Sequence, residues 1–200
     1  TLEHAPQWDL IVGAGRTLTR APHPAHAALL LLDALEPVGV SKLALDVGGV
    51  AGMLGALAGR HPLAAAEVVE YDAFLTMGTV VAPSGTAQPG EVALRVKVNC
   101  PDGRVVQKEV AYGSVAAIPL GAGKRALLEL HPTRRFDVGL GEPGRSATAE
   151  AEGGILGVVI DARGRPLALP ADGAGRRRLI QGWLGSLRLG PGAADMGSEQ

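Results

Sequence analysis

The sequence is poor in cysteine and in aromatic residues. Cys100 is its one cysteine, so no internal disulfide can form, and a reducing compartment such as the cytoplasm is the simplest location for such a chain. Only 3% of its 200 residues are aromatic, so the core has to be built from Ala, Val, Leu and Ile. No apolar run reaches the roughly 18 residues that a membrane span requires, and residues 1–8 lack the apolar segment of a signal peptide. We expect a cytoplasmic protein without a membrane partner.

A strong net charge is also missing. The formal net charge is −1, so no overall field attracts nucleic acid. The charge is nevertheless uneven, because residues 1–100 carry 6 Lys and Arg against 9 Asp and Glu, whereas residues 101–190 carry 13 against 9. The second half is therefore mildly basic, at +4, and could offer a surface to an anion.

The first third of the chain alternates short apolar runs with helical segments. Pro24 near the first turn and Pro37 just past the end delimit an Ala- and Leu-rich helix. Strand–helix alternation of this kind predicts an α/β domain with a parallel sheet. The predicted strands are 8–12 and 42–47, and the predicted helices are 24–36, 50–58 and 63–70.

From residue 72 the pattern changes to short runs rich in Val, Leu and Ile between Gly, Pro and Asp. Residues 91–98 alternate apolar and polar side chains, as a half-buried strand does, and Asp102-Gly103 is a strong hairpin signal. Many short, closely spaced strands predict an antiparallel β-barrel or sandwich. The strands are predicted over 76–82, 91–99, 104–111, 114–120, 124–131, 134–138, 146–151, 155–160 and 166–169.

A final helix is predicted over 172–188, with Asp172 as its cap and one apolar face that includes Trp183. Gly182 and Gly185 weaken this helix by about 1 kcal/mol each relative to Ala, so we expect it to dock on the rest of the chain. The predicted organisation is a partial parallel α/β segment over 1–71, a β-barrel or sandwich module over 72–171, a docking helix over 172–189 and a disordered tail over 190–200.

Two glycine-rich turns are the strongest candidates for a ligand site. The first follows a predicted strand, and glycines there let the backbone approach a ligand closely. It lacks the third glycine of a dinucleotide-binding fingerprint, so a plain turn is the alternative. The second could hold phosphate or Mg²⁺, but no partner carboxylate is identifiable nearby, and we interpret Asp46 as a helix cap. The turns are Gly13-Ala14-Gly15-Arg16 and Asp46-Val47-Gly48-Gly49.

Other chemistry-bearing residues lack the partners that a site requires. His23 and His26 lie three residues apart, as two metal ligands on a helix would, but no third ligand has matching spacing, and we predict no metal site. No nucleophilic serine motif occurs, so we assign no catalytic residue. A small enzyme that uses Asp137, Asp161 and nearby arginines is the remaining enzymatic alternative.

Arginines of the second half are candidates for a partner or anion surface. Gathered on one face, guanidinium groups could bind phosphate or an acidic partner. Nucleic acid usually also requires stacking aromatic residues, of which this part of the chain has few, so nucleic acid is not the expected partner. Solvated arginines balanced by neighbouring acidic residues are the alternative. The candidate residues are Arg134, Arg135, Arg163 and Arg165.

Several stretches together resemble a known family. They are Val80 to Pro83 with Gly90 to Val96, Arg135 to Gly141 and, most specific of all, Glu152 to Leu167, which reads E-G-G-I-L-G-V-V-I-D-A-R-G-R-P-L. The upstream run over 29–58 fits the same pattern. In these stretches the chain resembles the C-terminal part of the glutamate mutase MutL family, which is unrelated to the mismatch-repair protein of the same name.

That family is similar in its larger N-terminal part to the actin, Hsp70 and acetate-kinase group of ATPases. The resemblance implies that residues 1–71 form the C-terminal portion of an actin-like ATPase domain, in which Gly13, Ala14, Gly15 and Arg16 would contact adenosine. The phosphate loops would precede Thr1, so we interpret the chain as part of a longer protein. No cofactor is then expected for this part alone, and ATP would belong to the full-length protein.

The functional expectation follows from the same resemblance. It implies a non-catalytic C-terminal part of an accessory, chaperone-like or reactivating ATPase that serves an adenosylcobalamin-dependent mutase, and this mutase is the expected partner. The alternative rests on the basic second half. It is an independent β-barrel module that binds an anion, nucleic acid or a protein partner.

Overall fold

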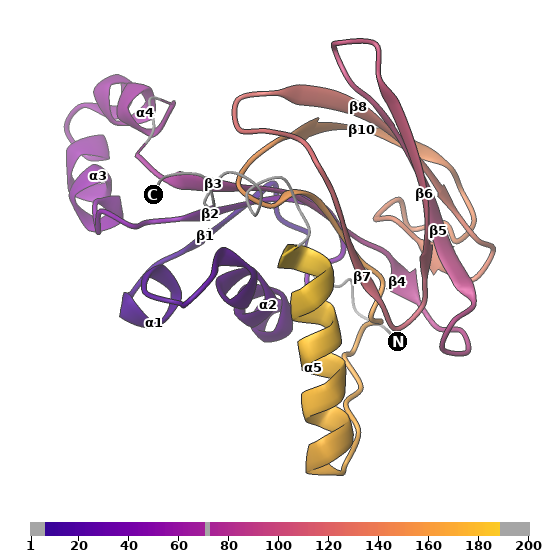
Figure 1. Ribbon diagram of the computed structural model, residues 1–200. Coiled ribbons are helices and arrows are strands. Elements are labelled where there is room, and N and C mark those ends of the chain that lie inside the picture. Colours follow the sequence, from indigo (N-terminus) through magenta and orange to yellow (C-terminus); the bar gives the residue numbers. More distant parts are fainter. Residues whose placement is uncertain (1–6, 71–72, 189–200) are drawn as a thin grey trace, which may run out of the picture.

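The computed structural model describes residues 7–70 and 73–188, and its largest element is a mixed five-stranded sheet (Figure 1). The strand order is β1-β2-β3-β11-β7. β1 runs parallel to β2 and β3 parallel to β11, whereas the β2–β3 and β11–β7 pairs are antiparallel. The strands are β1 (Leu10–Gly13), β2 (Gly39–Leu45), β3 (Leu75–Ala82), β7 (Val115–Ile118) and β11 (Gly157–Asp161).

The second sheet is antiparallel and has the linear order β10-β8-β5-β6, so it is open rather than a closed barrel. One hydrophobic core joins it to the five-stranded sheet, with Leu94 and Leu128 on one side and Val81 and Ile160 on the other. The two sheets therefore form a sandwich. The strands of the second sheet are β5 (Val92–Asn99), β6 (Val105–Ala111), β8 (Arg125–Pro132) and β10 (Ala147–Glu152). A separate short ladder pairs β4 (Ser84–Gly85) with β9 (Phe136–Asp137).

Helices α2 (Pro24–Leu35) and α5 (Gly173–Arg188) cover the other face of the five-stranded sheet. α2 begins at Pro24 because the His23 imidazole accepts the Ala25 N–H at 3.1 Å, and proline has no N–H to satisfy. It ends at Glu36, which adopts the left-handed conformation with φ 44°. The short helix α1 (Arg16–Thr19) precedes it.

Neighbouring residues of the central strands face opposite cores. Val81 and Val158 belong to the core between the sheets, whereas Val80 and Val159 belong to the core under the helices. The two-residue period of a strand places them in this way. Both faces are therefore buried, which explains why β3 and β11 do not alternate apolar and polar residues in the sequence.

Glycines let the connection from β10 to β11 lie close against β3. A Cβ on Gly154 would lie 2.6 Å from Gly78 N and from Thr76 O, which is closer than real side chains approach backbone atoms. Gly157 adopts φ 73° and follows at the start of β11. The segment Glu152 to Gly157 therefore needs glycine for packing, independently of any ligand.

Most predicted elements are confirmed, with small shifts at their ends. The predicted helices correspond to α2, α3 (Ala51–Ala58), α4 (Pro62–Glu70) and α5. The prediction of a strand over 166–169 is wrong. The Leu167 N–H donates to the Glu36 carboxylate at 2.9 Å instead of to a ladder. α1 is a single turn that the sequence pattern did not reveal.

The five-stranded sheet contains strands from both sides of residues 71–72, because β3, β7 and β11 join β1 and β2. The predicted parallel sheet is thus mixed, with β1 and β2 as its N-terminal parallel pair. The predicted tail over 190–200 lies outside the described residues. Among those described, no helix has the length and apolar character needed to cross a membrane.

Candidate functional site

The two glycine-rich turns predicted from the sequence lie side by side at the carboxyl edge of β1 and β2. The last residues of these parallel strands, Gly13 and Leu45, are register partners. The Asp46 N–H donates to Gly13 O at 2.8 Å and ties the second turn to the first. In open α/β sheets, ligands bind outside the carboxyl ends of strands, so this edge is the candidate site.

The residues of the first turn play different structural parts. Gly13 is buried, and a Cβ there would lie 3.0 Å from the side chains of Leu18, Leu31 and Leu45. Gly15 adopts φ 91° with open space around the position of a Cβ. Ala14, Gly15 and Arg16 are exposed. Gly13 is therefore required by packing, whereas the other three residues are accessible to a ligand.

The second turn is organised by a buried carboxylate. Asp46 is 4% exposed, and its two oxygens accept the N–H groups of Val50 at 2.8 Å and Ala51 at 2.9 Å. These are unsatisfied donors at the start of α3, so the interpretation of Asp46 as a helix cap is confirmed. Its oxygens point into the helix rather than toward the first turn, and Mg²⁺ would have to displace the cap.

The histidine pair stabilises the ends of helices. His23 caps α2, and the His26 ring lies 3.2 Å from His23 O and 3.4 Å from the guanidinium of Arg188 on α5. Burial, together with the positive charge of Arg188, lowers the pKa of His23. No group of three or more His, Cys, Asp or Glu side chains within the described ranges is placed to hold a metal ion.

The four candidate arginines divide into two pairs. Arg134 and Arg135 are exposed, and Arg135 pairs with Glu91 at 3.2 Å. Arg163 and Arg165 are inside the molecule, with 0% and 5% of their side-chain surface exposed. The four arginines therefore do not form one surface. Of the predicted anion surface, only Arg134 and Arg135 are accessible.

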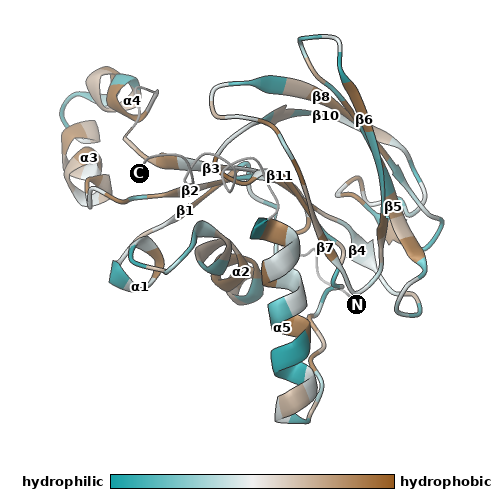
Figure 2. Ribbon diagram, in the orientation of Figure 1, coloured by the Kyte–Doolittle hydropathy of each residue, from teal (hydrophilic) through white to brown (hydrophobic). Residues whose placement is uncertain are grey.

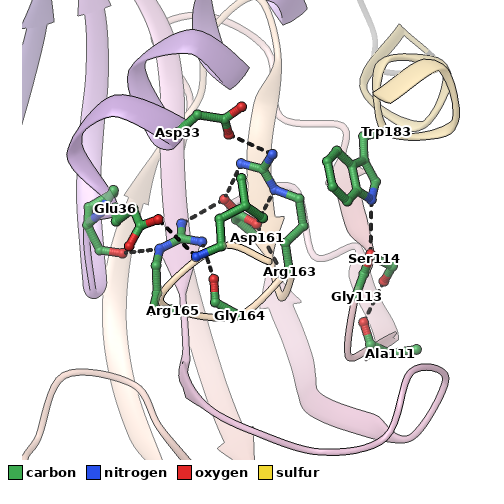
Figure 3. Close-up of polar contacts among 12 residues, drawn as sticks. Asp33, Glu36, Ala111, Gly113, Ser114, Asp161, Arg163, Gly164, Arg165 and Trp183 are labelled. Atoms are coloured by element: carbon green, nitrogen blue, oxygen red, sulfur yellow. Dashed lines mark hydrogen bonds and ion pairs between the residues drawn. The ribbon is translucent and has the colours of Figure 1, made fainter. Parts of the chain in front are cut away.

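The buried pair surrounds Asp161 (Figure 3). Arg163 binds both oxygens of this carboxylate, at 2.8 and 2.9 Å, and Arg165 binds Oδ2 at 2.7 Å. Burial on its own would raise the pKa of Asp161, but the two guanidinium groups outweigh it and hold the pKa below its ordinary value. Asp161 thus remains ionised as the centre of a structural ion cluster.

Asp33 of α2 is the member of this cluster that sequence reasoning missed. Its Oδ1 lies 2.7 Å from Arg163 Nη1, an ion pair in which the N–H is not aligned for a hydrogen bond. Asp33 and Arg163 are 130 positions apart, and no local pattern predicts such a contact. Burial raises the pKa of Asp33 more than Arg163 lowers it.

The enzymatic alternative finds no support in the placement of its carboxylates. Asp161 has no exposed side-chain surface, so a substrate cannot reach it. Asp137 accepts the N–H groups of Gly139, Leu140 and Gly141 at 2.8 to 3.1 Å and closes a turn. Both groups are used to organise the backbone or to balance buried charge.

A hollow of about 340 Å³ lies away from the candidate edge, where the N-terminal end of β1 faces β10. Val38, Val40 and Leu130 supply apolar walls, and Asp9 and Thr148 supply polar groups. Cys100 is a buried free thiol in the β5–β6 turn.

No protein-family model, curated protein or solved structure significantly matches the chain.

Proposed function

We propose that this chain is the non-catalytic C-terminal part of an accessory, reactivating ATPase that serves an adenosylcobalamin-dependent mutase. The observation that carries the proposal is the carboxyl edge of β1 and β2, where Gly13 to Arg16 and Asp46 to Gly49 lie side by side. This edge supplies one wall of a nucleotide cleft. Residues 152–167 resemble the MutL family of glutamate mutase, and we infer from this resemblance that the partner is the mutase.

The exposed part of the first turn fits the adenosine side of such a cleft. Ala14, Gly15 and Arg16 are accessible, and the absence of a side chain at Gly15 leaves room for a flat ring system. The fit does not extend to the phosphates or to Mg²⁺, because the Asp46 oxygens cap α3. ATP would supply the energy of phosphate cleavage, and the remaining residues that hold it would come from outside this chain.

The first test measures ATP binding. MgATP is titrated calorimetrically into the isolated chain, and hydrolysis is followed by phosphate release. We expect no tight binding and no turnover, because a single wall of the cleft leaves the phosphates in water. Micromolar affinity accompanied by hydrolysis would contradict the non-catalytic assignment.

The second test measures the partner directly. A purified adenosylcobalamin-dependent glutamate mutase is titrated with the chain, and binding is followed by surface plasmon resonance. The double variant Arg134→Ala/Arg135→Ala probes the exposed pair on the β-sandwich, and Arg104→Ala, in the exposed β5–β6 turn, is the matched control. Failure of the wild-type chain to bind at near-millimolar concentration would remove the mutase from the proposal.

The alternative function, an independent module for an anion or nucleic acid, rests on fewer groups than the sequence indicated. Arg134 and Arg135 remain exposed, but Arg163 and Arg165 are buried and paired with Asp161. Binding to phosphates is salt-dependent because counterions are released. The test is a gel-shift measurement with an oligonucleotide at low salt. If the wild-type chain shifts the oligonucleotide and the Arg134→Ala/Arg135→Ala variant does not, this alternative is favoured over the accessory role.

A further inference from the structure

The helical hairpin of α3 and α4 is an apolar element without a core of its own. We call residues 51–69 the arm. It stands apart from α2, α5 and the four-stranded sheet (Figure 1), and neither described hydrophobic core contains an arm residue. α3 has no buried residue, Met53 is 66% exposed and Leu63 is 81% exposed.

The composition of the arm is that of a buried element. Figure 2 shows both helices mostly in the shades of hydrophobic residues, with hydrophilic colour at the turn between them. α3 reads A-G-M-L-G-A-L-A and has no polar face. A helix that is apolar all round is normally covered, and one of eight residues is marginal in water without packing. Another surface is therefore expected to cover the arm.

The arm carries few charged side chains. Arg60 lies in the turn at the tip, and Glu67 lies on α4, roughly 8 Å closer to the base by the rise of a helix. Both residues are exposed. Met53 and Leu63 supply apolar surface on the two helices. The arm thus carries a cation at its tip and an anion in the second half of α4.

We propose that the arm is the docking surface for a second copy of this chain, paired antiparallel about a two-fold axis. A two-fold axis brings the same patch of both copies together, so the tip of each arm lies beside the second half of α4 of the other. Arg60 of each copy then meets Glu67 of the other, and the apolar middles cover one another. The arm is complementary to itself in charge and in polarity, so a second copy of the chain fits it without any other partner.

The dimer is expected to be weak. α4 has nine residues and is therefore about 13 Å long. The face of one such hairpin is smaller than the roughly 800 Å² that each partner buries in a standard interface. Association should therefore depend on concentration across the micromolar to near-millimolar range. The ATP and mutase titrations do not require it, so its failure and the failure of the proposed function are distinguishable.

Sedimentation equilibrium of the whole chain over this range is the first experiment. We expect a reversible monomer–dimer equilibrium that Leu63→Asp abolishes. Leu127→Asp is the matched control, because Leu127 is 46% exposed on β8, away from the arm. This variant should dimerise as the wild-type chain does. Far-UV circular dichroism checks that both variants fold. A wild-type chain that stays monomeric throughout, or a dimer that Leu63→Asp leaves intact, overturns the proposal.

Charge exchange tests the antiparallel geometry. Arg60→Glu and Glu67→Arg each place like charges in both contacts, so each variant alone should dimerise several-fold more weakly. A mixture of the two variants restores both opposite-charge contacts and should form heterodimers preferentially. A mixture that associates no better than either variant contradicts the pairing. If the arm of a monomeric chain instead binds the mutase and Leu63→Asp breaks that complex, the mutase is the occupant and the second copy is not.

Discussion

Arg163 lies across the face of the Trp183 indole, with its Cζ 4.8 Å from the ring centroid. Trp183 comes from α5, and its Nε1–H also donates to Gly113 O at 2.9 Å, just before β7 (Figure 3). One side chain of the C-terminal helix therefore contacts both the buried ion cluster and the backbone of the turn that precedes the edge strand β7. A desolvated cation–π contact of this kind contributes about 2 kcal/mol, so Trp183 attaches α5 to the sheet together with Leu187, the other buried residue of this helix.

Trp183→Ala should lower the free energy of unfolding by about 3–5 kcal/mol, because a buried aromatic side chain is removed. Trp183→Phe keeps the ring but loses the hydrogen bond to Gly113 and should cost about 1–2 kcal/mol. Urea unfolding followed by circular dichroism measures both. Leu179→Ala is the control on the same helix, since Leu179 is 38% exposed. If Trp183→Ala costs no more than Leu179→Ala, α5 is held by other contacts.

Asp161→Asn should be among the most damaging conservative substitutions in the chain. It removes the carboxylate charge that both Arg163 and Arg165 bind, while leaving both guanidinium groups buried. Breaking one partner of a buried ion pair typically costs about 3–5 kcal/mol. Urea unfolding at neutral pH measures this loss, and Glu142→Gln, which breaks the exposed pair of Glu142 with Arg145, is the control with an expected change below about 1 kcal/mol.

The two carboxylates that contact Arg163 should respond to acid with opposite signs. The pKa of Asp161 is lowered, so its stabilising contribution is present above the ordinary carboxyl pKa and is lost as the pH falls through the lower, folded value. The pKa of Asp33 is raised, so its contribution is present at low pH and is lost as the pH rises through the folded value.

Unfolding free energies measured from pH 7 down to pH 2 therefore separate the two. Asp161→Asn should make the acid-induced loss of stability shallower than in the wild-type chain, whereas Asp33→Asn should make it steeper. Equal slopes in both variants would mean that the two carboxylates titrate alike, which contradicts the opposite shifts of their pKa values.

The sequence predicted the local elements but not how they combine into sheets. Runs such as 91–99 carry a two-residue period, which identifies β5 without tertiary information. β3 and β11 are buried on both faces and carry no period, and their parallel pairing joins segments about 80 residues apart. Such pairing depends on packing between distant residues, which no local pattern contains.

The candidate site shows the same division. Glycines after a strand indicated both turns, and the parallel pairing of β1 with β2 accounts for their meeting at one edge. The ion cluster was not predictable, because Arg163 and Arg165 look like surface arginines until Asp33 and Asp161 are placed around them. Charged residues are almost always exposed unless they are paired, and the sequence does not show the pairing.

Two glycines should respond oppositely to alanine. Gly154→Ala introduces a Cβ that would lie 2.6 Å from backbone atoms of Thr76 and Gly78, so the strands must move, and we expect a loss of several kcal/mol. Gly182→Ala introduces a Cβ with nothing within 4 Å on an exposed position of α5, and should stabilise the chain by about 1 kcal/mol. Thermal unfolding compares the variants, and destabilisation by both would contradict the open surroundings of Gly182.

Asp46→Ala should loosen the arm while leaving the two cores intact. The substitution removes both hydrogen bonds at the start of α3, and the loss of such a cap costs about 0.5–2 kcal/mol. α3 has no buried residue to compensate, so the loss should appear locally. Hydrogen exchange at the Val50 and Ala51 amides should accelerate, with little change in the strands.

Asp172→Ala provides the control for this last effect, because Asp172 directly precedes α5 and caps it by accepting the Gly175 N–H at 2.6 Å. It should accelerate exchange at the start of α5 and leave α3 unchanged. The dimer proposed for the arm should weaken with Asp46→Ala and not with Asp172→Ala, since a frayed α3 no longer presents an ordered surface. Unchanged exchange at Val50 in Asp46→Ala would mean that the cap does not hold α3, and the arm would need another source of order.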